Sequence, residues 1–261
     1  MTEARHSRSR APGTPYVTLS SAMSIDGYLD TALPPRLVLS NAADLDRVDE
    51  LRAENDAIMV GARTVRRDNP RLLVRDEARR ERRLASSRGM LPWKVTVTSS
   101  GDLDPCAAFF TKGDTEKLVY CPTSLRASLA RRLGSLATVV GLGEEVAMHE
   151  LLRDLHERGV DSVVVEGGGS VHTQLLTSGL ADELHLVVAP FFIGDSRAPR
   201  LVADGSFQWT ADHRARLLEA RPVGDVVLLR YALSERCHDE AAADPAGGGP
   251  ATGVAGPRSS G

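Results

Sequence analysis

The chain has 261 residues, of which 42% are hydrophobic and 26% are charged. This composition is ordinary for a globular protein and allows one large domain or two small ones. The formal net charge of -3 and a pI near 6.2 exclude an electric field over the whole protein that would attract nucleic acid or an anionic membrane. Any anion-binding site must therefore be local, and a small molecule is the expected partner.

The three cysteines, Cys106, Cys121 and Cys237, are odd in number, and their spacing matches neither a disulfide framework nor a zinc site. We therefore expect a reducing, cytoplasmic environment and no metal. No apolar run approaches the length of a membrane span.

Both ends of the chain differ in composition from its middle. Residues 1–15 are rich in Arg, Ser and Pro, and residues 234–261 are rich in Ala, Gly and Pro. Such segments bury too little apolar surface to offset the entropy of ordering, so we expect both to be disordered. Between them, residues 16–233 alternate short β-type runs with amphipathic stretches. This alternation predicts one α/β domain with a largely parallel sheet.

The predicted elements follow in chain order. Strands are expected at residues 16–22, 57–60, 94–98, 117–121, 138–141, 162–165 and 183–189, where β-branched residues are frequent. Helices are expected at residues 43–54, 124–133, 146–158 and 170–178. In the third helix, Val146, His149, Leu152 and Leu155 recur at helical spacing. Residues 215–220 and 225–231, joined by a turn at 221–224, predict an antiparallel hairpin at one edge of the sheet.

Residues 75–88 contain six arginines and three acids. This segment could be mistaken for a nucleic-acid-binding patch, but no aromatic residue is interleaved with the arginines. Asp76 can pair with Arg79 and Arg80 at helical spacing. A solvated helix is therefore favoured over a binding role.

The clearest chemical signal is the transition from the apolar residues 163–165 into Glu166, three glycines and Ser170. Glycines allow a ligand to approach the backbone, and a helix that begins at Ser170 would offer free N–H groups to a pyrophosphate. The pattern is not G-x-G-x-x-G and lies late in the chain, which counts against a standard Rossmann domain. The alternative is a simple tight turn, for which three glycines would be an unnecessary entropic cost.

Two further strand ends carry weaker signals. Residues 57–60 lead into Gly61 and a short polar helix start, which would place Thr64 and Asp68 near a cofactor and Arg75 near an anion. The alternative is a loop with surface arginines. The first strand ends in a loop with Asp26-Gly27, which by itself indicates only a turn.

Together these segments resemble the reductase domain of bifunctional riboflavin-synthesis proteins and of stand-alone pyrimidine reductases. The resemblance covers residues 16–202 and rests on four ordered segments: VTLSSAMSIDG, LRAENDAIMVGARTVRRDNPRLLVR, VVVEGGGSVHTQLL and ADELHLVVAPFFIGD. Residues 61–64 are also similar to the Gly-Arg-x-Thr turn of dihydrofolate reductases. The resemblance implies a dihydrofolate-reductase-like α/β fold, a mixed and mostly parallel sheet flanked by helices, and a homodimer.

The resemblance also implies NADPH as the cofactor. It places the cofactor against Ala22, Thr64, Asp68, Ser99, Gly168, Gly169, Ser170, Val171, His172, Thr173 and Gln174. The hydroxyl of Ser99 could bond an adenosine 2′-phosphate, and Arg63 could add positive charge there.

The same resemblance places the substrate against Ser24, Arg52, Leu72, Arg75 and Glu166. Guanidinium groups bind phosphate bidentately, so Arg52 and Arg75 suit a ribose phosphate. The implied reaction transfers hydride from nicotinamide C4 to C1′ of a ring-opened ribosylamine and yields a ribitylamine. Glu166 is the predicted catalytic residue, which orients ribose hydroxyls or assists proton movement. The alternative is that Glu166 only accepts from a backbone N–H.

Three functions remain open. The leading one is reduction of 5-amino-6-(5-phosphoribosylamino)uracil. The second is the same reduction of the diamino-pyrimidinone counterpart, or reduction of dihydrofolate, and the third is a non-catalytic NADPH-binding paralogue. Ser20 stands where bacterial members of the family usually carry a lysine, which leaves the pyrimidine open. The sequence lacks H-x-E with a later P-C-x-x-C, so we expect a reductase without a fused zinc deaminase.

Overall fold

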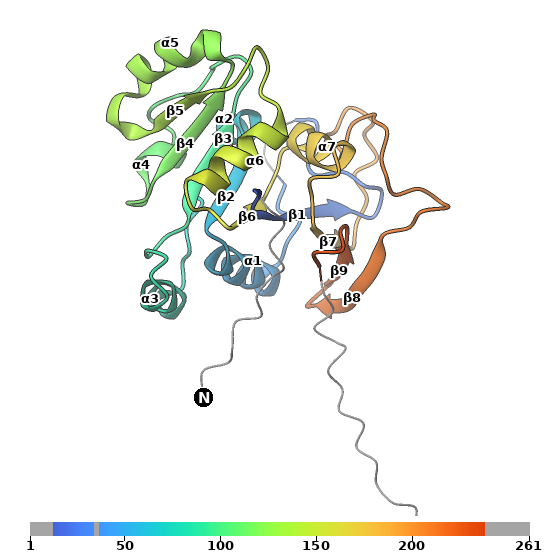
Figure 1. Cartoon of the computed structure of the whole chain (residues 1–261). Coiled ribbons are helices and arrows are strands. Elements are labelled where there is room, and N and C mark those ends of the chain that lie inside the picture. The colour runs from blue at the N-terminus through green and yellow to red at the C-terminus, as the bar shows by residue number, and fades with distance from the viewer. Residues whose placement is uncertain (1–12, 34–36, 238–261) are drawn as a thin grey trace, which may run out of the picture.

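A nine-stranded sheet organises the residues that the computed structural model describes, 13–33 and 37–237 (Figure 1). Its strands are β1 (Tyr16–Ser24), β2 (Ala57–Gly61), β3 (Trp93–Val97), β4 (Lys117–Cys121), β5 (Thr138–Gly141), β6 (Ser162–Val165), β7 (Glu183–Ala189), β8 (Arg216–Val223) and β9 (Val226–Ala232). They lie side by side in the order β5-β4-β3-β2-β6-β1-β7-β9-β8.

The first seven strands of that order pair in parallel, and β9 pairs antiparallel with both β7 and β8. The predicted mixed, mostly parallel sheet with a C-terminal antiparallel hairpin is therefore confirmed. The predicted position of the hairpin turn is wrong. The chain turns at Gly224 and Asp225, and β8 continues through Pro222. Proline is tolerated there because β8 is an edge strand, where one side needs no backbone donor.

Helices cover both faces of the sheet. They are α1 (Ala42–Glu54), α2 (Ala62–Asp68), α3 (Glu77–Ala85), α4 (Ala108–Thr111), α5 (Thr123–Leu133), the 3-10 turn η1 (Gly134–Leu136), α6 (Met148–Glu157) and α7 (Gly169–Thr177). Apolar residues of α6 and α7 share one core with β1 and β6, and those of α1, α2, α4 and α5 share the core on the other face. Burial on both faces explains why the inner strands are continuously apolar.

Helix α6 forms where a helix is predicted, but its buried stripe differs from the predicted one. Met148, Leu151, Leu152 and Leu155 are buried, whereas His149 is exposed. The helix begins only at Met148, so Val146 precedes it. Leu152 and Leu155 are thus confirmed as part of the buried stripe, and the prediction is wrong for Val146 and His149.

The arginine-rich segment forms α3, which lies beside α1 (Figure 1). The expectation of a simply solvated helix is wrong in part. Arg83 is buried and donates to the carbonyl oxygens of Ala53 and Asn55. Arg79 pairs with acids of α1, while Asp76 caps α3 by accepting from the backbone N–H of Arg79. Several of these cations are therefore used to dock α3 on α1.

The domain extends beyond the predicted limit at residue 233. Ser234 and Arg236 both donate to the buried carboxylate of Asp182, and Cys237 is buried. The rest of the two segments predicted to be disordered, residues 1–12 and 238–261, lies outside the described residues. Among the described helices, none has the length and apolar composition needed to cross a lipid bilayer.

Candidate active site

A cavity of about 1250 Å³ lies at the carboxyl ends of the central parallel strands. Its walls come from β1, from the ends of β2 and β3, from Glu166 after β6, from α1, α2 and the start of α7, and from residues 199–204. Ligands of open α/β sheets bind outside the carboxyl ends of the strands, because loops and helix starts meet there. The predicted glycine turn and the predicted strand ends therefore face one common space.

The glycine turn joins β6 to α7 and is packed tightly against its neighbours. Gly167 has a φ of +132°, which side-chain-bearing residues rarely adopt. A Cβ on Gly168 would lie 3.2 Å from Thr64 Oγ1, and a Cβ on Gly169 would lie 2.8 Å from the carbonyl oxygen of Arg200. The glycines thus let α2 and the segment around Arg200 approach α7. Close packing explains them at least as well as access for a ligand does.

The start of α7 nevertheless has the features of an anion site. Gly168 is its N-cap and provides no capping side chain. The backbone N–H groups of Gly169 and Ser170 have no partner within residues 13–33 and 37–237. Free N–H groups at the positive end of a helix dipole bind phosphate oxygens well.

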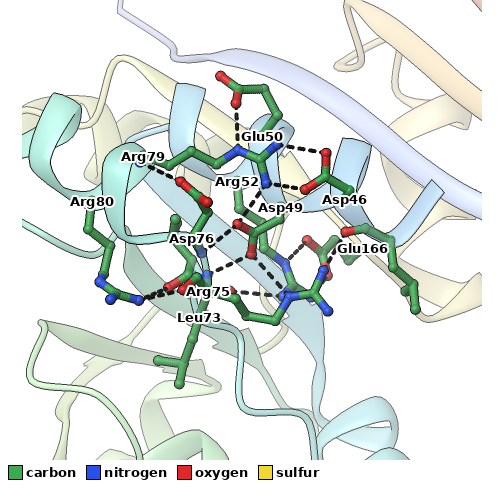
Figure 2. A network of polar contacts seen from close by, with 12 residues as sticks. Asp46, Asp49, Glu50, Arg52, Leu73, Arg75, Asp76, Arg79, Arg80 and Glu166 are labelled. Carbon is green, nitrogen blue, oxygen red and sulfur yellow. Dashed lines mark hydrogen bonds and ion pairs between the residues drawn. The ribbon is translucent and has the colours of Figure 1, made fainter. Parts of the chain in front are cut away.

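Glu166 and Arg52 form a bidentate ion pair in the cavity wall (Figure 2). Arg52 Nε and Nη2 donate to the two carboxylate oxygens of Glu166 at 2.6 and 2.7 Å. Arg52 Nη1 donates to the carbonyl oxygen of Leu73 at 3.0 Å. Burial lowers the pKa of Arg52, but the Glu166 carboxylate outweighs that effect and the net pKa is raised. Because the pair fixes the carboxylate, Glu166 presents its remaining lone pairs in a defined direction.

The cavity is also lined by polar side chains that are not among the predicted site residues. Arg47 donates to Asp44 at 2.7 Å, and Arg200 donates to the hydroxyl of Tyr28 at 3.0 Å. Asp44, Val48 and Arg52 follow one another at four-residue spacing on α1, which is a signal that could have placed Asp44 on the same helix face as Arg52. Arg200 lies in a loop and gives no such signal.

The family model described as the RibD C-terminal domain matches residues 15–229. This chain belongs to that family. The match includes every strand and helix that borders the cavity, so the site lies within the shared domain.

Relatives within the RibD C-terminal domain family include two archaeal proteins named 2,5-diamino-6-ribosylamino-4(3H)-pyrimidinone 5′-phosphate reductase. The one from Archaeoglobus fulgidus is 36% identical over 194 residues, covering 74% of this chain and 88% of the relative. The one from Methanothermobacter thermautotrophicus is 34% identical over 226 residues, covering 84% and 98%. Among solved structures, Acinetobacter baumannii RibD (form 2) superposes with a TM-score of 0.69 at 26% identity, covering 85% of this chain and 58% of that one.

A reductase of this family implies a reduced nicotinamide cofactor. The start of α7 fits its pyrophosphate, since Gly169 and Ser170 offer unpaired N–H groups there. Arg63 is exposed, lines the same cavity, and has no partner among the described residues. The chain therefore has donors for both the pyrophosphate and a further anionic group.

The structure brings most of the predicted site residues to the cavity. Among the predicted cofactor contacts, the lining includes Ala22, Thr64, Asp68, Ser99, Gly168, Gly169, Ser170, Val171 and Gln174. From the predicted substrate contacts it includes Arg52 and Glu166.

Five predicted residues are not part of the lining: Ser24, Leu72, Arg75, His172 and Thr173. Ser24 is buried and donates to Asp26, and Leu72 is buried in the core. Burial lowers the pKa of His172 to about 4. Thr173 bonds Gly169 and Ala203, which ties α7 to the loop that crosses it. The binding roles of these residues remain predictions.

Arg75 lies outside the cavity lining. Its Nε donates to Asp49 at 3.2 Å, its Nη2 donates to the carbonyl oxygen of Leu45, and 57% of its side chain is exposed. A guanidinium engaged in this way has fewer free donors for a phosphate than the predicted anchoring role assumes. That role too remains a prediction.

Proposed function

We propose that this protein catalyses the NADPH-dependent reduction of a ribosylamino-pyrimidine 5′-phosphate to the ribitylamino product in riboflavin biosynthesis. The observation that carries the proposal is the Arg52–Glu166 pair, which shares one cavity with the anion-binding start of α7 in a member of the RibD C-terminal domain family. A cavity of about 1250 Å³ is large enough for a dinucleotide and a second ligand together.

The chain's own residues have positioning roles in this reaction. When bound, the nicotinamide supplies the hydride. The N–H groups of Gly169 and Ser170 bind its pyrophosphate, and Ser99 with Arg63 binds the 2′-phosphate that distinguishes NADPH from NADH. Glu166 orients the hydroxyls of the opened ribose, and Arg52 fixes Glu166 and keeps two of its five N–H groups for the substrate phosphate.

The diamino-pyrimidinone is our first candidate for the substrate, ahead of the uracil. The two archaeal relatives that align over 88% and 98% of their own length are named for the diamino compound. Ser20 lines the cavity, and its hydroxyl can accept a hydrogen bond from an amino group, which a lysine ammonium cannot do. The uracil is the second candidate, because a hydroxyl can also donate to a ring carbonyl.

The test follows NADPH absorbance with purified protein and four substrates in parallel: the diamino compound, the uracil, the dephosphorylated diamino compound and dihydrofolate. We expect turnover of the diamino phosphate and at least tenfold lower kcat/KM without the phosphate. Turnover of dihydrofolate alone would contradict the proposed substrate class. NADPH binding without any turnover would favour the non-catalytic paralogue.

A matched series with NADH tests the proposed preference for NADPH.

The homodimer and the cytoplasmic location that the family resemblance implies also remain predictions. Sedimentation of the purified full chain would test the first.

A further inference from the structure

Asp49 is a buried carboxylate on α1, one turn before Arg52. Its side chain is only 1% exposed. Burial raises the pKa of Asp49, but hydrogen bonds from Arg75, Asp76 and Arg79 outweigh that effect and lower it. Asp49 is therefore ionised at neutral pH, and its oxygens need strong donors in the folded protein.

Those donors come from the irregular segment that links α2 to α3. The backbone N–H of Arg75 donates to Asp49 Oδ1 at 2.7 Å, and the backbone N–H of Asp76 donates to Oδ2 at 3.1 Å. The side chains of Arg75 and Arg79 add bonds of 3.2 and 3.1 Å. One carboxylate thus holds two consecutive backbone amides in place (Figure 2).

The held segment includes the carbonyl group that Arg52 uses. Leu73 lies two residues before Arg75, and its carbonyl oxygen accepts from Arg52 Nη1 at 3.0 Å. Arg52 uses its other two nitrogens to hold both oxygens of Glu166. A continuous set of bonds therefore runs from Asp49 through the backbone at residues 73–76 to Arg52 and then to Glu166 (Figure 2).

We propose that Asp49 is a positioning residue, which orients the Arg52–Glu166 pair by fixing the carbonyl of Leu73. Asp49 is not part of the cavity lining, so it acts through Arg52 and not on a ligand. The inference rests on the proposed reduction for its kinetic consequence, but its structural consequence can be measured without substrate.

The nearby Asp46 offers a matched control. It also lies on α1 and also pairs with Arg79, through bonds of 2.7 and 2.9 Å. Its side chain is 68% exposed, and it has no hydrogen bond to the backbone of residues 73–76. Asp46→Asn removes the same charge beside the same arginine and leaves the held segment intact.

The experiment compares wild type, Asp49→Asn and Asp46→Asn by two readouts. The first is hydrogen exchange of the Arg52 Nε–H, observed by NMR with ¹⁵N-labelled arginine and assigned with Arg52→Lys. The second is steady-state kinetics together with the NADPH Kd. For Asp49→Asn we expect about tenfold faster exchange of the Arg52 Nε–H and about tenfold lower kcat/KM for the pyrimidine, with the NADPH Kd changed by less than about twofold. For Asp46→Asn we expect all three quantities within about twofold of wild type.

Asp49→Glu is a second variant, because it keeps the charge and moves the carboxylate away from the two amides. We expect it to change both readouts in the same direction as Asp49→Asn. The proposal is overturned if the Asp49 variants fold and their Arg52 exchange rate and kcat/KM match those of Asp46→Asn. It is also overturned if both Asp49 variants unfold while Asp46→Asn folds, because Asp49 would then serve global stability. Absence of turnover by wild type would contradict the proposed function instead, and the exchange comparison would still decide the role of Asp49.

Discussion

The two walls of the cavity are built by different means. The wall at the start of α7 consists of backbone and small residues, where a Cβ on Gly168 or Gly169 would lie only 3.2 or 2.8 Å from its nearest neighbour. The wall at α1 includes charged side chains, where Arg52 and Glu166 are held by one ion pair and a backbone carbonyl. A backbone wall is shaped by sterics and a side-chain wall by charge, so substitutions should affect them in different ways.

This difference suits the two ligands that we propose. The pyrophosphate of a dinucleotide is bound well by fixed N–H groups, which need no charged side chain. A ribosylamine that reacts at C1′ needs groups that orient hydroxyls and phosphate, which ionised side chains do more strongly. The comparison therefore predicts that charge-neutralising changes reduce turnover, and that steric changes reduce cofactor affinity and stability.

Glu166→Gln tests the charged wall most strongly. The amide keeps the shape but cannot accept at both atoms, and it leaves the half-buried Arg52 without its counter-ion. We expect kcat to fall on the order of 100-fold or more, with the NADPH Kd nearly unchanged. Stopped-flow and equilibrium binding measurements would separate the two quantities. An unchanged kcat would return Glu166 to a structural role.

A third region, the ion-pair cluster of β7 and β9 around Glu183, should control the stability of the protein in acid. Burial raises the pKa of Glu183, but bonds from His185 and Arg230 outweigh that effect and lower it from 4.5 to about 2. The unfolded chain then holds this proton more tightly, so stability is complete above pH 4.5 and is lost as the pH falls toward 2. The contribution is on the order of 3 kcal/mol. Urea unfolding at a series of pH values should show this slope.

Glu183→Gln provides the control, because it should flatten the dependence of stability on pH in this window. If the slope persists in that variant, other carboxylates cause it.

Gly169→Ala tests the backbone wall. Its Cβ would lie 2.8 Å from the carbonyl oxygen of Arg200, so the backbone must shift. We expect the free energy of unfolding to fall by about 2 kcal/mol and the NADPH Kd to rise several-fold, while kcat at saturating NADPH changes less. Gly168→Ala, whose Cβ would lie 3.2 Å from Thr64 Oγ1, should show the same effects more weakly. Loss of kcat alone in Gly169→Ala would contradict a steric role.

Arg75→Ala should have the smallest effect. Its guanidinium is engaged by Asp49 and Leu45 and is largely exposed, so we expect the KM for the phosphorylated substrate to rise by about threefold or less. The NADPH Kd should not change. A much larger rise in KM would show that Arg75 turns toward the substrate phosphate, as the family resemblance implies.

Much of the fold could be predicted because its signals are local. The bounds of β4, β5, β6 and β7 match the predicted ranges, since each contains a short run of apolar residues that includes valine. The first half of the predicted α6 stripe is wrong because Val146 and His149 fit helical spacing as well as Met148 and Leu151 do. The periodicity of one sequence does not determine the residue at which a helix begins.

The candidate site could be predicted only in part. Glu166 and the glycines stand out because a buried strand ends at them. The position of Arg75 could not be predicted, because it depends on Asp49, which is 26 residues away in sequence. The same holds for Arg200, whose loop has no periodicity and meets Tyr28 across 172 residues.

The end of β8 also bears on how this chain can meet other copies of itself. An edge strand offers unpaired backbone groups to which a foreign strand can add. Pro222 removes one donor from that edge, and Arg221 with Glu219 places charge along it. These residues would therefore interrupt the addition of a neighbouring molecule's strand near the hairpin turn. Such an interruption disfavours uncontrolled fibre-like association.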